Sequence, residues 1–267
     1  KNNWWTVVGL GHKPRIFITT FLRGGPRWRF SEENFAYLFF GSDQSKKANF
    51  SFGMINSAAK QNNFSFKRYE FKFNYQPINS LSLSLETAFG KNPNRTQYVS
   101  EKSFGATQRY ILGEIDQQTW STSLRVNYSI NPNLSVQFYG SPFITRGRYS
   151  NFNFVKNASA ENLNDRVTWY TSNQITQNGT TFSIDENTDS VTDYEFRKPD
   201  FTFAQFRSNL VIRWEYIPGS EMFLVWSRGA TGTGNINDPL SSTVNSLIFD
   251  KKADDTFLFK LTYRFLR

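Results

Sequence analysis

The sequence contains no cysteine and a single histidine, His12, among its 267 residues. The lack of cysteine excludes disulfide bonds, thiol catalysis and zinc sites with cysteine ligands. One histidine gives little basis for a histidine metal cluster or a Ser-His-Asp triad. We therefore expect no metal, no cofactor and no catalytic residue in this chain.

Long hydrophobic runs are also missing, since no stretch approaches the roughly 18 consecutive apolar residues of a transmembrane helix. The mean hydropathy is −0.54. These values exclude a helical membrane protein but not a membrane β-barrel, in which only alternate residues contact lipid. Aromatic residues make up 18% of the chain, and 28 of them are phenylalanine. Such a composition is typical of strands in which every second side chain is large and apolar.

The charge balance is basic, with a net charge of +9. A basic chain suits nucleic acid when its lysines and arginines cluster on one surface. Here they are scattered through alternating segments. We therefore expect no nucleic-acid partner.

The segment 207–229, RSNLVIRWEYIPGSEMFLVWSRG, alternates between apolar and charged residues on either side of a Pro-Gly turn. Successive side chains of a strand point to opposite faces, so this segment predicts a hairpin with one apolar and one charged face. The apolar face carries Leu210, Ile212, Trp214 and Tyr216, and the other carries Arg207, Asn209, Arg213 and Glu215. A water-soluble sandwich and a membrane barrel with a polar interior both explain this pattern.

The same alternation recurs along the chain and predicts an all-β fold. One segment changes parity near Lys67 and Arg68, where we expect a β-bulge. The expected strands cover residues 2–10, 14–23, 27–41, 46–59, 63–76, 80–98, 107–130, 133–150, 201–217, 220–229 and 255–266.

The connections between these strands favour the membrane barrel over the sandwich. Short turns are expected around residues 76–79, 131–133 and 218–220, and longer connections around 91–107, 151–200 and 229–255. Short turns at one rim and long loops at the other are typical of an up-and-down outer-membrane β-barrel. Since about 9–11 residues cross the membrane, the strand 109–130 should project beyond it on the long-loop side.

Single-chain bacterial barrels have even strand numbers, and the turn positions place residues 2–10 running inward from outside. At least one strand should then precede Lys1. We therefore expect one transmembrane β-barrel domain over residues 1–267, incomplete at its N-terminal side and part of a larger barrel. Its location would be the outer membrane of a Gram-negative bacterium, in contact with lipid, with residues 151–200 as a long extracellular loop.

The connection 151–200 holds eight acidic and four basic residues. Trp169 and Tyr170 lie in it and are candidates for contacts with a ligand. The stretch Asp185–Asp189 begins like a calcium-binding loop, but Ser190 replaces the glycine and Phe196 the glutamate of that motif, which favours a solvated acidic loop. The glycine-rich stretch 229–235 lacks the Lys-Ser/Thr ending of a phosphate-binding loop.

Charged residues on the expected inward face form the main candidate set: Glu70, Lys72, Glu86, Arg125, Arg207, Arg213, Glu215, Lys260 and Arg264. Charges of both signs fit a hydrated, ion-paired lumen network better than a selective pore, which would favour one sign. The alternative is a path for solutes or a surface that docks a plug. The tryptophans Trp4, Trp5, Trp28, Trp120, Trp214 and Trp226 are expected in the aromatic belts at the membrane interfaces, with stacking on sugars as the alternative.

Several segments resemble a Bacteroidota outer-membrane family, the domain-of-unknown-function family 5916. These are the hairpin at 207–229, RGGPRWRF at 23–30, GSDQSKK at 41–47, RYILGEIDQQTWSTSLRVNYSINPNLSVQFYGSPF at 109–143 and DDTFLFKLTYRF at 254–265. The resemblance implies a β-barrel that follows a carbohydrate-binding family 9-like domain. Sugar binding would belong to that preceding domain, and no catalytic residues are implied.

Three functions remain open from the sequence. The first is surface-glycan binding or handling, with the barrel as the anchor of the carbohydrate-binding domain. The second is an accessory subunit of a larger outer-membrane complex for secretion, assembly or uptake. The third, a membrane-associated hydrolase, is least favoured because the chain offers no nucleophile and base together.

Overall fold

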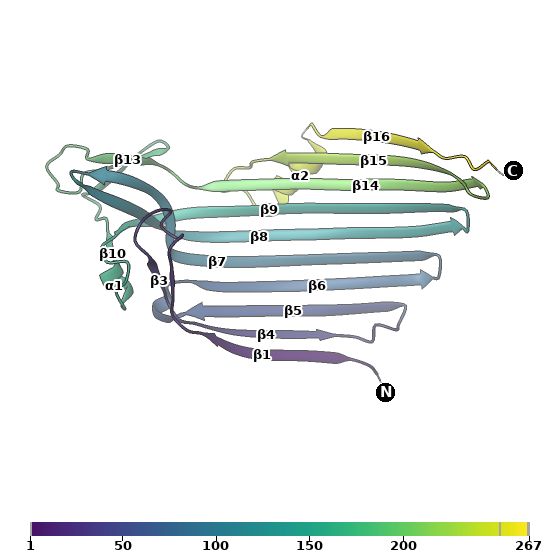
Figure 1. The fold of residues 1–267 in the computed structure, drawn as a ribbon, viewed down its shortest axis with the longest axis horizontal. Helices are drawn as coiled ribbons and strands as arrows, with labels where there is room; N and C mark the ends of the chain where they lie inside the picture. The colour runs from purple at the N-terminus through teal and green to yellow at the C-terminus, as the bar shows by residue number, and fades with distance from the viewer. Residues whose placement is uncertain (1, 251, 266–267) are drawn as a thin grey trace.

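The computed structural model describes residues 2–250 and 252–265. The chain forms one large antiparallel sheet, and most of the smaller elements are gathered at one end of it (Figure 1). The short strand β10 (Val167–Trp169) pairs with β9 of this sheet. The other strands, in spatial order, are β1 (Trp5–Lys13), β4 (Glu33–Gly41), β5 (Ala48–Ala59), β6 (Ser65–Ile78), β7 (Leu81–Phe104), β8 (Thr107–Asn131), β9 (Leu134–Val155), β14 (Phe201–Ile217), β15 (Ser220–Gly232) and β16 (Asp254–Leu261).

The all-β antiparallel prediction is confirmed, but a closed barrel is not observed. Over the described residues the sheet is open, with β1 and β16 as its two edges. The predicted alternation is realised in the register: Phe73 of β6 lies opposite Leu85 of β7, and Leu85 lies opposite Leu124 of β8. We call this side of the sheet the apolar face. The side that bears Glu70, Lys72 and Glu86 is the polar face.

Tight turns gather at one end of the sheet, the short-turn end. β6 and β7 are joined by residues 79–80, β8 and β9 by residues 132–133, and β14 and β15 by Pro218 and Gly219. Gly219 adopts a positive φ of 79°, which favours glycine in a two-residue turn. The prediction of short turns at one rim is confirmed, although β6 runs two residues further than expected.

The opposite end, the long-loop end, differs from the prediction at the β7–β8 connection. Residues 91–107 do not form a loop, because β7 continues to Phe104 and turns at Gly105. As predicted for residues 109–130, β8 is a long strand, and β7 to β9 extend past the other strands at this end (Figure 1). The extension is stable because β8 and β9 continue to pair there, as far as Ile111 opposite Phe154.

The connection after β9 is an ordered insertion rather than a bare loop. It contains α1 (Leu163–Arg166), β10 and a three-stranded sheet of β11 (Ile175–Asn178), β12 (Thr181–Ile184) and β13 (Tyr194–Arg197). Phe182 and Phe196 of the small sheet pack on Phe152 of β9. The insertion therefore has an apolar core of its own against the projecting strands.

The expected strand 14–23 is wrong, and the expected strand 27–41 is divided. A hairpin of β2 (Ile16–Ile18) and β3 (Trp28–Phe30) leaves the main sheet, and β4 begins only at Glu33. The hairpin folds away because Leu22 and Trp28 become fully buried with Leu163 of the insertion. The bulge expected near Lys67 is also wrong, since the β5–β6 register runs without a shift. The parity of apolar residues changes there because Phe64 packs on Phe30 of the hairpin.

Two helical elements complete the structure. The 3-10 turn η1 (Lys60–Asn62) joins β5 to β6. Helix α2 (Leu240–Phe249) packs Val244 and Leu247 on Ile144, Ala204 and Ala230, at the long-loop end of the apolar face. No helix in the described part of the chain is long and apolar enough to cross a membrane.

Candidate functional site

The apolar face carries a continuous band of large side chains across the sheet. On β6 the band runs from Tyr69 to Ile78, which matches the roughly 9–11 residues of a membrane-crossing strand. Its β6 members Tyr69, Phe71, Phe73 and Tyr75 are 37–41% exposed. The band continues through Leu83, Leu85 and Phe89 of β7, Leu124 and Val126 of β8, Val136 and Phe138 of β9, Leu210 and Ile212 of β14, Leu224 of β15, and Phe257 and Phe259 of β16. An exposed apolar surface of this extent marks contact with another apolar phase or partner.

Polar and charged side chains bound this band at the long-loop end. Lys91 of β7 and Asp116 of β8 form an ion pair of 3.2 Å one residue pair beyond Phe89 on the same face. On the neighbouring strand, Arg146 donates a hydrogen bond of 2.8 Å to Gln118 of β8. The apolar face therefore changes to a polar surface along a defined line across β7, β8 and β9.

Three of the tryptophans expected in interfacial belts do lie on the apolar face, at the two margins of the band. Trp120 of β8 lies opposite Phe89 near the charged boundary, and Trp226 of β15 lies opposite Leu210. Trp214 is 45% exposed near the short-turn end. This distribution is typical of the aromatic girdles of membrane barrels.

The other three predicted tryptophans have different environments. Trp4 packs edge-on against Phe50 of the apolar face, with ring centroids 5.6 Å apart. Trp5 lies on the polar face against Gly41. The expectation for Trp28 is wrong, because this side chain is fully buried in the core beneath the insertion. The local alternation around Trp28 gave no indication that the chain folds back there.

The nine predicted inward charges lie on or beside the polar face. Glu70, Lys72, Glu86, Arg125, Arg207, Arg213, Glu215 and Lys260 share that face by the register of their strands, and Arg264 follows the end of β16. They extend from β6 to the end of β16 and do not meet in one cluster.

Five of these nine charged side chains make contacts with neighbouring residues on the same face or at its turn. Glu70 pairs with Arg68 at 2.6 Å, and Arg213 pairs with Glu221. Arg125 lies over the ring of Tyr139, and Lys260 over the ring of Phe223. Glu215 accepts the amide hydrogen of Gly219 at 2.8 Å. Sequence reasoning missed the partners Arg68 and Glu221, although both follow the same alternation.

Neutral polar side chains connect the strands between these charges. Asn74 of β6 donates a hydrogen bond to Asn49 of β5 and accepts one from Ser84 of β7, both at 2.8 Å. These three residues line a polar cavity of about 360 Å³ near the short-turn end. The polar face therefore offers hydrogen-bonding groups, while Val211, Phe223 and Val225 on β14 and β15 make it locally apolar.

The predicted loop contacts Trp169 and Tyr170 are partly buried in the insertion. The Trp169 ring stacks against the guanidinium group of Arg95, at 5.0 Å. The Tyr170 hydroxyl lies 3.0 Å from the hydroxyl of Tyr194, which donates to Glu186 at 2.5 Å. Burial raises the pKa of both tyrosines, so both remain protonated at neutral pH. Glu186 in turn forms a bidentate pair with Arg109 of β8, which fixes the insertion on the sheet.

Carboxylates of the acidic stretch 185–189 form hydrogen bonds and ion pairs with protein groups. Asp185 accepts the amide hydrogens of Asp189 and Ser190, and Glu186 is held by Arg109. Within residues 2–250 and 252–265, no group of three acidic or histidine side chains is placed to hold a metal ion.

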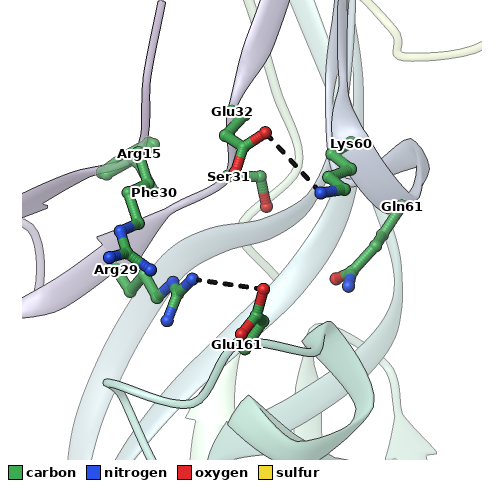
Figure 2. A pocket seen from close by; sticks show the side chains of 8 residues that line it. All are labelled: Arg15, Arg29, Phe30, Ser31, Glu32, Lys60, Gln61 and Glu161. Carbon is green, nitrogen blue, oxygen red and sulfur yellow. Dashed lines mark ion pairs between the residues drawn. The ribbon is translucent and has the colours of Figure 1, made fainter.

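A small cavity lies where the β2–β3 hairpin, η1 and the insertion meet (Figure 2). Its volume is about 20 Å³, which is room for about one water-sized group. Arg15 and Arg29 lie on one side and Lys60 and Gln61 on the other, with Ser31 between them; the lining is completed by Phe30, Glu32 and Glu161. No local sequence pattern indicates this site, because its residues come from three separate connections.

Arg166 of α1 is buried behind this cavity and is 1% exposed. It donates hydrogen bonds to the Arg29 carbonyl at 2.5 Å and to the Ser31 hydroxyl at 2.9 Å. Its guanidinium group also lies over the ring of Trp28, at 5.5 Å. Burial, and then the neighbouring charge of Arg29, lower the pKa of Arg166 to about 10, so it remains a cation at neutral pH.

No match to a curated protein was found for this sequence. A family model described as Domain of unknown function (DUF5916) matches residues 23–266. The match includes nine of the ten long strands, from β4 to β16, and the insertion after β9. Because it extends over most of the sequence, the chain belongs to this family.

Proposed function

We propose that this sheet is part of the wall of a transmembrane β-barrel in the outer membrane of a Gram-negative bacterium, with the long-loop end outside the cell. The observation that carries the proposal is the apolar band, which has the height of a lipid core and ends at the Lys91–Asp116 pair. Lipid would cover the apolar face, and water would fill the space beside the polar face.

The edges of the sheet support closure by further strands. β1 and β16 each leave one row of backbone groups without a strand partner in the described residues. Unpaired backbone groups are costly in lipid, where only helices and closed barrels satisfy them. Additional strands between these edges would complete the wall.

The absence of a cysteine allows a direct test of the membrane orientation. Single cysteines replacing Leu85 on the apolar face and Ser84 on the polar face can carry a fluorescent label in lipid vesicles. The label at position 85 should be quenched by a lipid-attached quencher, and the label at position 84 by a soluble one. Equal quenching of both labels from water would contradict the proposal.

For the biological role, we propose an anchor for a carbohydrate-binding module that binds or handles surface glycans. The support is the resemblance of the sequence to a Bacteroidota outer-membrane family, which implies a carbohydrate-binding family 9-like domain before the barrel. Glycan-array binding by the protein with that module, compared with this chain alone, tests the role. Loss of binding when the module is removed is the expected result.

A second candidate is an accessory subunit of a larger outer-membrane complex. The observation that favours it is the ordered insertion 151–200, whose three-stranded sheet presents a folded surface beyond the rim. Gentle solubilisation from the membrane, followed by native mass and peptide identification, separates the two roles. A stoichiometric partner supports the subunit, and a single polypeptide supports the anchor.

A further inference from the structure

The cavity in Figure 2 lies in an unbalanced concentration of positive charge. Arg15, Arg29 and Lys60 line it. Among the described residues, the carboxylates that line the cavity with these three cations are Glu32 and Glu161. Arg166 does not line the cavity but donates a hydrogen bond to the lining residue Ser31. In the described part of the chain, neither Arg15 nor Arg166 has a carboxylate within 4 Å, the limit for an ion pair. Arg166 is buried, whereas Arg15 is exposed and open to a ligand from solvent. A buried cation without a counter-charge is costly, so the surroundings of Arg166 favour an anion.

The two ion pairs at the cavity are loose. Lys60 lies 3.6 Å from Glu32, and Arg29 lies 3.8 Å from Glu161. A close charge-assisted hydrogen bond has a length of about 2.7–2.9 Å, so these cations keep donors that an anion can accept. The side chains of Lys60 and Glu161 are 62% and 67% exposed, which allows this outer wall to adjust.

The deeper wall is fixed and presents further donors. Ser31 is held by Arg166, and the Gln61 carbonyl oxygen accepts the amide hydrogen of Leu163 at 2.7 Å. That bond leaves the Gln61 amide group to donate, and it bonds Asn162 at 3.0 Å. Planar guanidinium groups match the geometry of oxyanions, which makes arginines the usual residues at such sites.

We propose that this cavity binds an oxyanion group, such as a sulfate, phosphate or carboxylate, through Arg15, Arg29 and Lys60. The volume of about 20 Å³ has room for about one oxygen atom of the charged group, and leaves the rest of that group and any sugar ring at the open outer wall. The proposal rests on the proposed function only for the source of this group, which would be an acidic sugar of a surface glycan. A free inorganic anion has the same chemistry.

The test uses the whole chain in detergent and measures binding of inorganic sulfate and phosphate by calorimetry, at an ionic strength held constant with chloride. Saturable binding of either ion is expected. Arg15→Gln should weaken it at least tenfold, because it removes one of the three cations that line the cavity. Among the described residues Arg15 has no ion-pair partner that the substitution would disturb. Arg27→Gln is the matched control, since Arg27 lies on the same hairpin but over Phe17 and outside the cavity.

A second arm identifies the source of the oxyanion. A sulfated or uronate-containing oligosaccharide that binds more tightly than inorganic sulfate, and competes with it, assigns the site to acidic glycans. Equal or weaker binding of the oligosaccharide assigns it to a free ion. The site itself is disproved if neither ion binds above chloride, or if Arg15→Gln and Arg27→Gln have the same effect. These outcomes do not depend on whether the labels at positions 84 and 85 contact lipid.

Discussion

Ile212 and Arg213 are neighbours in β14 whose side chains lie on opposite faces of the sheet. Ile212 lies between Val136 of β9 and Leu224 of β15, inside the apolar band. Arg213 forms an ion pair with Glu221 on the polar face. Two adjacent positions therefore have environments of opposite polarity.

We expect Ile212→Arg to impair folding into lipid vesicles far more than Arg213→Gln. A lipid-facing arginine costs about 2–4 kcal/mol near the centre of the bilayer. Arg213→Gln keeps a polar group on the polar face and should change the unfolding midpoint little. Urea titration of the folded protein in vesicles measures both variants. A similar loss of stability in the two would refute the two-face model.

The Arg109–Glu186 pair joins the insertion to β8, and its loss should loosen the insertion. In Glu186→Gln, Arg109 loses a charged partner at 2.8–3.0 Å in a site where both side chains are largely buried. Hydrogen bonds to charged groups contribute about 1.5–3 kcal/mol, so the unfolding free energy should fall by that order.

Hydrogen exchange of residues 175–197 measures this loosening. Glu195→Gln is the control, because Glu195 is exposed on the same small sheet and, within the described part of the chain, its side chain bonds only Ser183. Equal protection in Glu186→Gln and the wild type would show that the apolar core alone holds the insertion.

Asp43 predicts a pH dependence in the connection between β4 and β5. Its pKa lies below the ordinary value of 3.8, first because the Ser45 hydroxyl donates to it and then because the Ser45 amide does. A carboxyl group with a lowered pKa in the folded state stabilises the protein above its ordinary pKa. This contribution disappears as the pH falls through the lower, folded-state pKa.

The stability difference between the wild type and Asp43→Ala should therefore be largest near neutral pH and shrink below about pH 4. Denaturant titrations from pH 7 to pH 2 measure it. Asp238→Ala is the control, because Asp238 is exposed and its side chain has no recorded hydrogen bond in the described residues. A difference that stays constant with pH would contradict the role of the charge.

Gly53 of β5 allows the Phe39 ring to lie over the backbone on the polar face. A Cβ added to Gly53 would approach this ring to 2.4 Å. Gly53→Ala should therefore displace Phe39 and cost about 1–3 kcal/mol in unfolding free energy. Gly229 of β15 lies on the same face with open space at its Cβ position, so Gly229→Ala should have little effect. Thermal unfolding of the two variants compares them.

Local periodicity explains which parts of the fold could be predicted. The β14–β15 hairpin and β8 follow a strict alternation of apolar and polar residues. That pattern is nearly sufficient to predict a strand that lies between two antiparallel neighbours. The polar-face positions of residues such as Glu70 and Arg125 follow from the same parity. Sequence alone could place them on a face, but not choose the partner of each charge.

The long-loop end could not be predicted because contacts distant in sequence determine it. Trp28 lies in a segment where apolar and polar residues alternate, yet Leu163 and Val167 of the insertion bury its side chain. The cavity beside Arg166 also depends on segments more than 100 residues apart, as in the Gln61–Leu163 hydrogen bond. No pattern within a single strand predicts such contacts between distant segments.

The extension of β7 to β9 beyond the charged boundary has a mechanical consequence. From residue 91 to residue 104, β7 rises by about 40 Å at the usual strand spacing. Paired strands of this length form a stiff stalk, so the insertion at its tip keeps a fixed height and orientation. A partner of the insertion would therefore bind at that distance from the apolar band. The distance would change with the length of the paired strands.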